Sequence, residues 1–570
     1  MSSQSFLAAT AGFCLLLGSC SVNKSESPNA NNFSRLTDDF VYGSLALSPI
    51  AATQAGYHAH NGASLDDKLD DMSPAGMAAQ RSFYAGIQSR ITALDPKSLD
   101  KEQAADLDII NSNIALSLLE LDTIQNYKHN PTLYVEGIGN ALFAPYVLDY
   151  APVEKRFEQI TGRLEKVPVF LEQAKGNLVD APEVWNRVAQ EENAGNIDLI
   201  DKTLRGAVPS AQKAAFDAAA AKAIASLTDF NAFLKDTLSK KTSDWRLGKE
   251  KYARKFEYVL AIGKTPEQLL TEAEAELQKT RDEMAKLAAP KSVKQALDEI
   301  AKQHATPDNY MADARKTLDQ ATAFVRDKGL LTVPASGNLQ VIETPEFMRG
   351  IYAVGGFNPA PALEPQLGAY YWVTPIPKTW TRERVESKLR EYNNFGLQHL
   401  TVHEAMPGHY VQFEYANHVE PPSRRALRSI FGNGPYVEGW AFYTQQMMTD
   451  QGYLAAQPGM KLTLYKQILR GVANTILDIR LQTMGMTDQQ ALDLMINGTY
   501  QEKEEATAKL QRAQLSSCQL PTYFSGWKGW LAARDQYQQK KGAAFSLRDF
   551  HERALKESAV PLPVLSRLLD

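Results

Sequence analysis

The sequence predicts a mainly α-helical protein with one small β-sheet. Long segments with helical periodicity follow one another from Phe33 onward, whereas β-branched or aromatic runs of strand length are few. With 570 residues, 44% hydrophobic and 22% charged, the chain is an ordinary globular sequence that can bury a large core. Its net charge of −5 leaves no basic stripe, so we expect no nucleic-acid partner.

The first residues predict an export signal. The apolar run from Phe6 to Gly18 is shorter than the roughly 20 residues that span a membrane, so residues 1–19 fit a signal peptide, although no Lys or Arg precedes the run. Leu17-Gly18-Ser19-Cys20 resembles a lipoprotein signal box, which would make Cys20 the lipidated first residue. Residues 20–32 are polar, fit for a flexible tether.

This leader predicts a location in the bacterial cell envelope. We expect a lipoprotein at the periplasmic face of the outer membrane, in contact with the membrane only through its lipid. A cleaved, soluble periplasmic protein and an unexported protein are the alternatives. Beyond the leader only Cys518 remains, so the mature chain cannot hold a disulfide framework. The oligomeric state is left open.

Helix-start signals and periodicity place the long helices. Ser73-Pro74 is an N-cap followed by Pro at the first helical position, and the segment runs through Ile91. Further long helices are expected at Leu99–Leu121, Val153–Lys175, Ser210–Leu238, Thr265–Ala288 and Tyr465–Met484. We expect one helical domain over residues 33–570, with an N-terminal half at about 33–330 and a second half at 331–570.

Two short segments predict the sheet. Leu330–Thr344 and Tyr370-Tyr371-Trp372-Val373 are β-branched or aromatic and are bounded by Pro and Gly. An edge strand here would pair its main chain with an extended peptide, which makes Tyr370 and Tyr371 candidates for substrate contact. The alternative is that these aromatic side chains only pack in the core and at its rim.

The segment His403-Glu404-Ala405-Met406-Pro407-Gly408-His409 predicts a metal site. Imidazole nitrogen is a zinc ligand, and the carboxylate beside one imidazole can act as a base. The two His are six residues apart, so an unbroken helix would direct them to different sides. Pro407 has no N–H to donate a hydrogen bond to the carbonyl of His403, and Gly408 tolerates unusual backbone angles. We therefore expect a helix that ends near Met406 and a tight turn that returns His409 toward His403.

A third ligand lies thirty residues further on. Asn433-Gly434-Pro435 predicts a helix start, which places Glu438 about one turn into a helix. His403, His409 and Glu438 then hold Zn²⁺ and leave a fourth position for water, while Glu404 is the general base. In a closed structural site His399 or His418 would be the fourth ligand instead.

The motif and its surroundings resemble a known family. The segments His403–Gln412 and Glu438-Gly439-Trp440-Ala441 look like the HExxPGHxxQ and EGWA signatures of bacterial domain of unknown function 885. That family is similar to helical zinc peptidases such as carboxypeptidase Taq, thimet oligopeptidase and angiotensin-converting enzyme. The resemblance implies a large helical metallopeptidase-like fold with a deep groove, and the zinc-dependent hydrolysis of short peptides by a carboxypeptidase, dipeptidase or oligopeptidase.

The resemblance also implies roles for later residues. Tyr523, in the stretch from Gln519 to Gly526, matches a Tyr of the family and is expected to stabilise the oxyanion, as phenols do in related peptidases. The remaining candidates for orienting a metal ligand or contacting the substrate are Asp478, Arg480, Gln519 and His551. A C-terminal carboxylate of the substrate could be bound by one of four arginines, Arg424, Arg425, Arg428 or Arg480. The competing hypothesis is a lipoprotein that binds peptides without catalysis, through a structural or vestigial metal site.

Overall fold

The computed structural model of the chain describes residues 28–335, 337–344, 349 and 355–569 and confirms a mainly α-helical fold. The signal peptide and Cys20 lie outside the described residues. Helix α1 begins at Pro28, five residues before the start expected at Phe33, so the end of the predicted tether is helical. Among the described residues, no helix is both long and apolar enough to cross a membrane.

Thirteen α-helices precede the main sheet in the described part of the chain. They are α1 Pro28–Leu47, α2 Pro49–Ala55, α3 Pro74–Thr92, α4 Lys101–Leu119, α5 Thr132–Val147, α6 Val153–Asn177, α7 Glu183–Asp198, α8 Arg205–Ala207, α9 Lys213–Asp236, α10 Gly248–Leu260, α11 Pro266–Ala288, α12 Val293–Ala301 and α13 Tyr310–Lys328.

The helices after the sheet carry the candidate site. They are α14 Arg382–Glu391, α15 Asn394–Glu404, α16 His409–Ala416, α17 Pro422–Ile430, α18 Gly434–Asp450, α19 Pro458–Thr483, α20 Asp488–Asp493, α21 Lys503–Leu515, α22 Pro521–Lys541, α23 Leu547–Lys556 and α24 Leu562–Leu568.

The predicted long helices form close to their expected bounds because their caps are local. The side chain of Ser73 accepts a hydrogen bond from Gly76 N at the start of α3, and Thr265 forms a capping box with Gln268 at the start of α11. Asp100 caps α4 in the same way, which sets its start at Lys101. Residues 210–212 form a separate 3₁₀ turn before α9, so the segment expected from Ser210 is divided.

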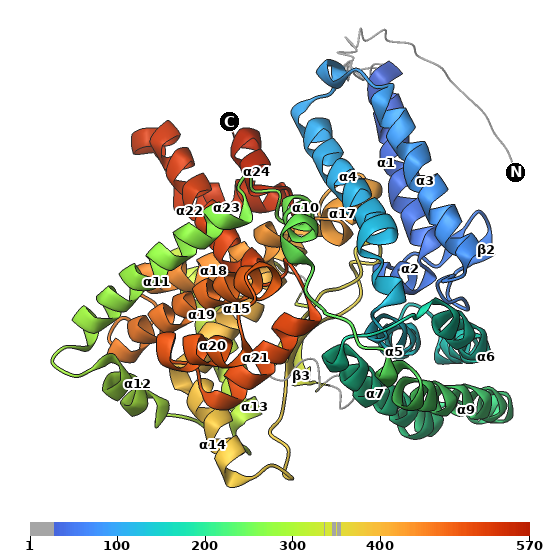
Figure 1. Ribbon diagram of the computed structural model, residues 1–570. Coiled ribbons are helices and arrows are strands. Elements are labelled where there is room, and N and C mark those ends of the chain that lie inside the picture. The colour runs from blue at the N-terminus through green and yellow to red at the C-terminus, as the bar shows by residue number, and fades with distance from the viewer. Residues whose placement is uncertain (1–27, 336, 345–348, 350–354, 570) are drawn as a thin grey trace, which may run out of the picture.

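Two hydrophobic cores organise the helices. A smaller core joins α5, α6, α7 and α9, which lie together on one side of the molecule (Figure 1). The larger core runs through α1–α4, α10, α11, α13 and most helices after the sheet, whereas α20 and α21 pack with part of α19 in a separate small cluster. The expected division near residue 330 therefore does not follow the packing, because α10, α11 and α13 share a core with the second half.

The sheet near the site has three strands in the order β3-β5-β4. Strand β3, Leu339–Glu343, is parallel to the central strand β5, Ala369–Val373, and β4, Gly355–Asn358, is antiparallel to it. The expectation of an edge strand at Tyr370–Val373 is therefore wrong. The Gly-Gly-Phe-Asn sequence of β4 carries no β-branched residue, which is why the outer strand was not foreseen. A separate two-stranded ribbon pairs β1, Ala59–His60, with β2, Ala63–Ser64.

Candidate metal centre

A tight turn between α15 and α16 brings the two histidines together. Helix α15 ends at Glu404, two residues before the expected end, and Thr401 O accepts hydrogen bonds from both Ala405 N and Met406 N. A Cβ atom at Gly408 would lie 1.9 Å from His403 O, so only glycine fits where the turn folds back onto the helix. The ring centroids of His403 and His409 are consequently 4.8 Å apart.

The EGWA segment holds this turn from the other side. The buried indole of Trp440 donates to Pro407 O at 2.9 Å and approaches Gly408 O at 3.2 Å. Gly439 faces Gly526 of α22 so closely that an added Cβ would lie 2.4 Å from Gly526 C. These contacts fix α18 against both the turn and α22, and thus place Glu438 beside the histidines.

Glu438 completes a cluster of three donors. The Asn433 side chain caps α18 by accepting from Tyr436 N at 3.1 Å, and Glu438 follows in the second turn. Glu438 Oε2 lies 3.5 Å from His403 Nε2 and 3.6 Å from His409 Nε2. Zinc ligands about 2.1 Å from a tetrahedral ion are about 3.4 Å from one another, so these separations fit a common ion.

The electrostatics of the cluster also fit a divalent cation. Burial alone would raise the pKa of Glu438, but the two imidazoles bring it well below its usual range, so the carboxylate is ionised. Glu438 Oε2 and His409 Nδ1 are buried and have no hydrogen-bond partner among the described residues. A cation at the three converging donor atoms, which lie within 4.8 Å of one another, would satisfy the carboxylate oxygen.

Neither expected fourth ligand joins the cluster. His399 is buried, and its Nε2 lies 3.1 Å from Met460 O; burial lowers its pKa to about 4. His418 is exposed just after α16. Within the described residues the candidate metal group consists of His403, His409 and Glu438 alone. The arrangement thus leaves a coordination position for water, as in catalytic zinc sites.

The cluster opens into a cavity of about 800 Å³. Glu404 lines it, is partly exposed, and makes no hydrogen bond or ion pair to other described residues, so its carboxylate is available to a water molecule. Tyr523 also lines it, with its ring stacked 6.3 Å from that of His403. Burial raises the pKa of Tyr523, although Arg512 opposes this effect, so its phenol remains a hydrogen-bond donor at neutral pH.

Several predicted site residues lie elsewhere. Asp478 is buried and accepts from Cys518 N at 3.3 Å, and it contacts no ligating histidine. His551 is buried between Tyr443 OH and Leu330 O and therefore has a structural role. Tyr371 is fully buried with its hydroxyl 3.2 Å from Thr401 Oγ1, and neither it nor Tyr370 is among the described residues that line the cavity.

The expected carboxylate-binding arginines are also elsewhere, because each already has a protein partner. Arg424 and Arg428 donate to Asp106 at 2.6 and 2.8 Å, and Arg425 donates to Ala362 O at 2.7 Å. Arg480 pairs with Glu274 at 2.5 Å. Gln519 lies closer to the site, since its Oε1 accepts from Arg512 at 2.9 Å.

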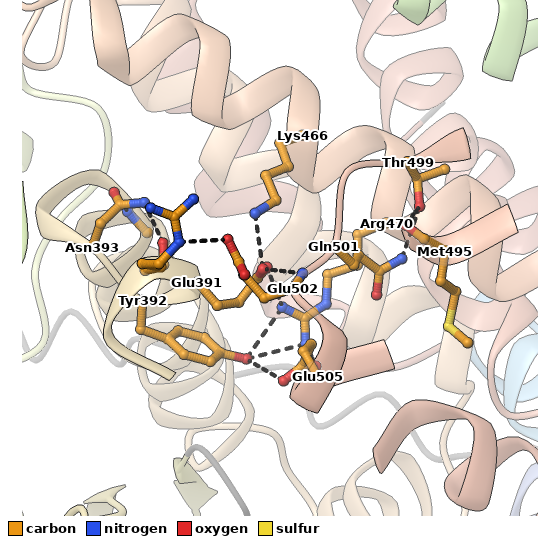
Figure 2. A network of polar contacts seen from close by, with 12 residues as sticks. Glu391, Tyr392, Asn393, Lys466, Arg470, Met495, Thr499, Gln501, Glu502 and Glu505 are labelled. Carbon is orange, nitrogen blue, oxygen red and sulfur yellow. Dashed lines mark hydrogen bonds and ion pairs between the residues drawn. The ribbon is translucent and has the colours of Figure 1, made fainter. Parts of the chain in front are cut away.

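Sequence reasoning missed a polar wall of the cavity. Arg470, Lys509 and Arg512 line the cavity together with Tyr392 and Glu505. Figure 2 shows the part of this wall in which Arg470 contacts both Tyr392 and Glu505. No local motif marks these residues, because they come from separate places in the chain: Tyr392 just after α14, Arg470 in α19, and the other three in α21. Their proximity to the metal site depends on the packing of helices far apart in sequence.

The chain was compared with known proteins. A family model described as bacterial protein of unknown function (DUF885) matches residues 49–569. The chain belongs to this family. No curated protein matches it.

Two solved structures resemble this member of the family over nearly their whole length. One, from Shewanella oneidensis, is described as "a putative lipoprotein of unknown function"; it is 29% identical, with 94% of this chain and 99% of that chain covered and a TM-score of 0.78. The other, described as "the putative lipoprotein from Colwellia psychrerythraea", is 18% identical, with 95% and 99% covered and a TM-score of 0.78. The second likeness shows the fold alone.

Proposed function

We propose that the protein is a zinc-dependent peptidase that hydrolyses short peptides. The observation that carries this proposal is the convergence of His403, His409 and Glu438 at zinc-ligand separations beside an unpaired Glu404. A site that only bound peptides would have no use for an unpaired carboxylate next to the metal ligands. The resemblance of the motif to helical zinc peptidases supports the same reaction.

The chain's own side chains have separate roles in this reaction. Zinc bound by the three donors would acidify water and polarise the scissile carbonyl. Glu404 accepts the proton of the attacking water and delivers it to the leaving amine. Tyr523 donates its hydroxyl proton to the developing oxyanion, while Arg512, whose Nη2 donates to the phenol oxygen at 3.1 Å, holds that ring in place.

Strand β4 offers a way to hold an extended peptide. Gly355, Gly356 and Phe357 line the cavity, and the ring of Phe357 stacks 6.4 Å from that of His409. Among the described residues, β4 is an outer strand that pairs only with β5. A peptide that adds to its free edge would gain main-chain hydrogen bonds that do not depend on its side chains.

We also propose that the protein is held in the bacterial envelope by a lipid on Cys20. The lipoprotein descriptions of the two similar structures support this location, as does the signal box at residues 17–20. Ser21 after the lipidated Cys favours the outer membrane, where the cavity would face peptides of the periplasm.

The variant Glu404→Gln tests the proposed activity. Glutamine keeps the size of the side chain and leaves the three ligands in place, so the purified variant should retain about one zinc per chain. Hydrolysis of a panel of dipeptides, acylated amino acids and cell-wall peptides should fall by at least about 10²-fold. Glu420→Gln, at a largely exposed carboxylate 11 residues after His409, is the matched control and should match wild type.

Two outcomes would contradict the proposal. Full activity of Glu404→Gln would remove this residue as the base. Zinc-loaded wild type that hydrolyses no peptide of the panel would refute the peptidase assignment.

A further inference from the structure

Two cations of α21 face the metal cavity without a carboxylate partner. Lys509 and Arg512 are three residues apart, so they share one face of the helix, and both line the cavity. Among the described residues, neither has a carboxylate oxygen within 4.0 Å. Arg512 is exposed, and its Nη2 donates to Tyr523 OH and to Gln519 Oε1, which leaves most of its five N–H groups unused.

The two acids whose charges act on Lys509 are already engaged by other side chains. Glu505 pairs with Arg470 and accepts from Tyr392 OH at 3.1 Å, and Glu391 accepts from Lys466 at 2.8 Å (Figure 2). Lys509 is 6% exposed. Its burial lowers its pKa well below the usual range, and the positive charge of Arg470 lowers it further. An anion beside Lys509 would offset both effects. Glu505 and Glu391 offset them only in part, and each already pairs with another cation.

The part of the cavity that α5 and α7 line offers no site for an anion. Glu136 of α5 and Glu192 of α7 line it, and burial, reinforced by Glu136 and Glu191, raises the pKa of Glu192 to about 8. Glu192 Oε2 has no hydrogen-bond partner among the described residues. The burial that favours the protonated form of Glu192 would also disfavour a substrate carboxylate near α5 and α7, whereas Lys509 and Arg512 favour one at α21.

We propose that Lys509 and Arg512 bind the C-terminal carboxylate of the peptide. This inference rests on the proposed peptidase function and names its substrate class, peptides with a free carboxyl end. Arg512 reaches the phenol of Tyr523 directly, and Lys509 is one helical turn away. Because an extended residue spans about 3.3 Å, a carboxylate held here places one of the last peptide bonds at the metal site. The activity is then that of a carboxypeptidase or dipeptidase.

Binding without turnover tests the assignment. Zinc-loaded Glu404→Gln protein is titrated calorimetrically with trialanine as its free acid and as its C-terminal amide. Loss of charge-assisted hydrogen bonds should make the amide bind at least about 10-fold more weakly than the acid. The triple variant that also carries Lys509→Met and Arg512→Gln should bind both forms equally.

Matched variants separate this role from others. Lys503→Gln removes an exposed cation of α21 that is not among the cavity-lining residues, and it should keep the preference for the acid. Tyr523→Phe removes the hydroxyl that Arg512 contacts, and it should also keep the preference. Zinc content and thermal unfolding show whether each variant folds. If the triple variant does not fold, the double variant Glu404→Gln with Arg512→Gln replaces it and should show a weaker preference for the acid over the amide.

The proposal and the underlying function fail in different ways. Equal binding of acid and amide by the Glu404→Gln protein, or a preference that survives loss of the cations, would overturn the carboxylate site even if wild type hydrolyses peptides. Selective binding of the acid by a wild type that hydrolyses no peptide would keep the site and refute the peptidase function.

Discussion

The indole of Trp440 is expected to control zinc affinity without touching the metal. Its Nε1 supplies the hydrogen bond at 2.9 Å to Pro407 O, and this buried carbonyl has no other hydrogen bond among the described residues. Gly408 O, 3.2 Å from the same nitrogen, also accepts from Gln412 N at 3.1 Å. The variant Trp440→Phe keeps an aromatic ring but deprives Pro407 O of its donor.

The magnitude follows from these contacts. A buried carbonyl that loses its only donor costs about 1–3 kcal/mol, and the smaller ring leaves a void that adds about 1 kcal/mol. The free energy of unfolding of the zinc-free protein should therefore fall by about 2–4 kcal/mol. The turn sets the position of His409 relative to His403, so zinc affinity should fall by about 10- to 100-fold, as for the loss of other groups that orient metal ligands.

The assay compares stability and zinc binding in one set of proteins. Urea unfolding after chelation measures the first, and competition with a chromophoric chelator measures the second. Trp185→Phe is the matched control, because its Nε1 also donates to a main-chain carbonyl, Gln514 O at 2.7 Å, but it lies in α7 away from the turn. Trp185→Phe should lose stability and keep zinc affinity. If Trp440→Phe binds zinc as tightly as wild type, the indole does not position the ligands.

Two further predictions concern the core and the anchor. Burial, opposed by the hydrogen bonds of Cys518 N and Tyr252, raises the pKa of Asp478 to about 7, so the folded protein keeps a proton that the unfolded chain releases near pH 4. This contribution to stability is present at low pH and is lost as pH rises from about 4 to about 7, and Asp478→Asn should remove it. Urea unfolding at about pH 5 and pH 8 measures the effect. If the free energy of unfolding changes equally between the two pH values in wild type and variant, the argument is contradicted. Labelled palmitate should enter wild-type protein and not Cys20→Ala, whereas equal labelling, or none in either, would show that the leader was misread.

The helices and the approach of His403 to His409 could be predicted because their signals are local in the chain. Ser73, Thr265 and Asn433 cap the helices that they precede, and each cap is a contact within three residues. The turn after Glu404 was also predictable, since proline interrupts a helix and glycine allows backbone angles that other residues avoid. What brought Glu438 to the histidines was packing, and only the family motif foresaw it.

The expectations that failed depended on partners from distant segments. The sequence around Arg428 contains nothing that reveals Asp106 on α4, which occupies its guanidinium in the fold. Likewise, Asp478 was expected to support a ligating histidine, but the packing of α19 directs it to Cys518. Charged residues near a motif are therefore poor evidence for substrate contact until their protein partners are known.

The same reasoning explains why the proposed carboxylate site could not be predicted from the sequence. A lysine and an arginine three residues apart on a helix are ordinary in sequence, because most such cations are solvated or paired. Lys509 and Arg512 differ in a property that only the fold defines. The neighbouring acids pair with Arg470 and Lys466, and among the described residues no other acid forms an ion pair with either cation. If Lys509 and Arg512 bind a carboxylate as proposed, the cavity would select a peptide by its charged end rather than by its side chains.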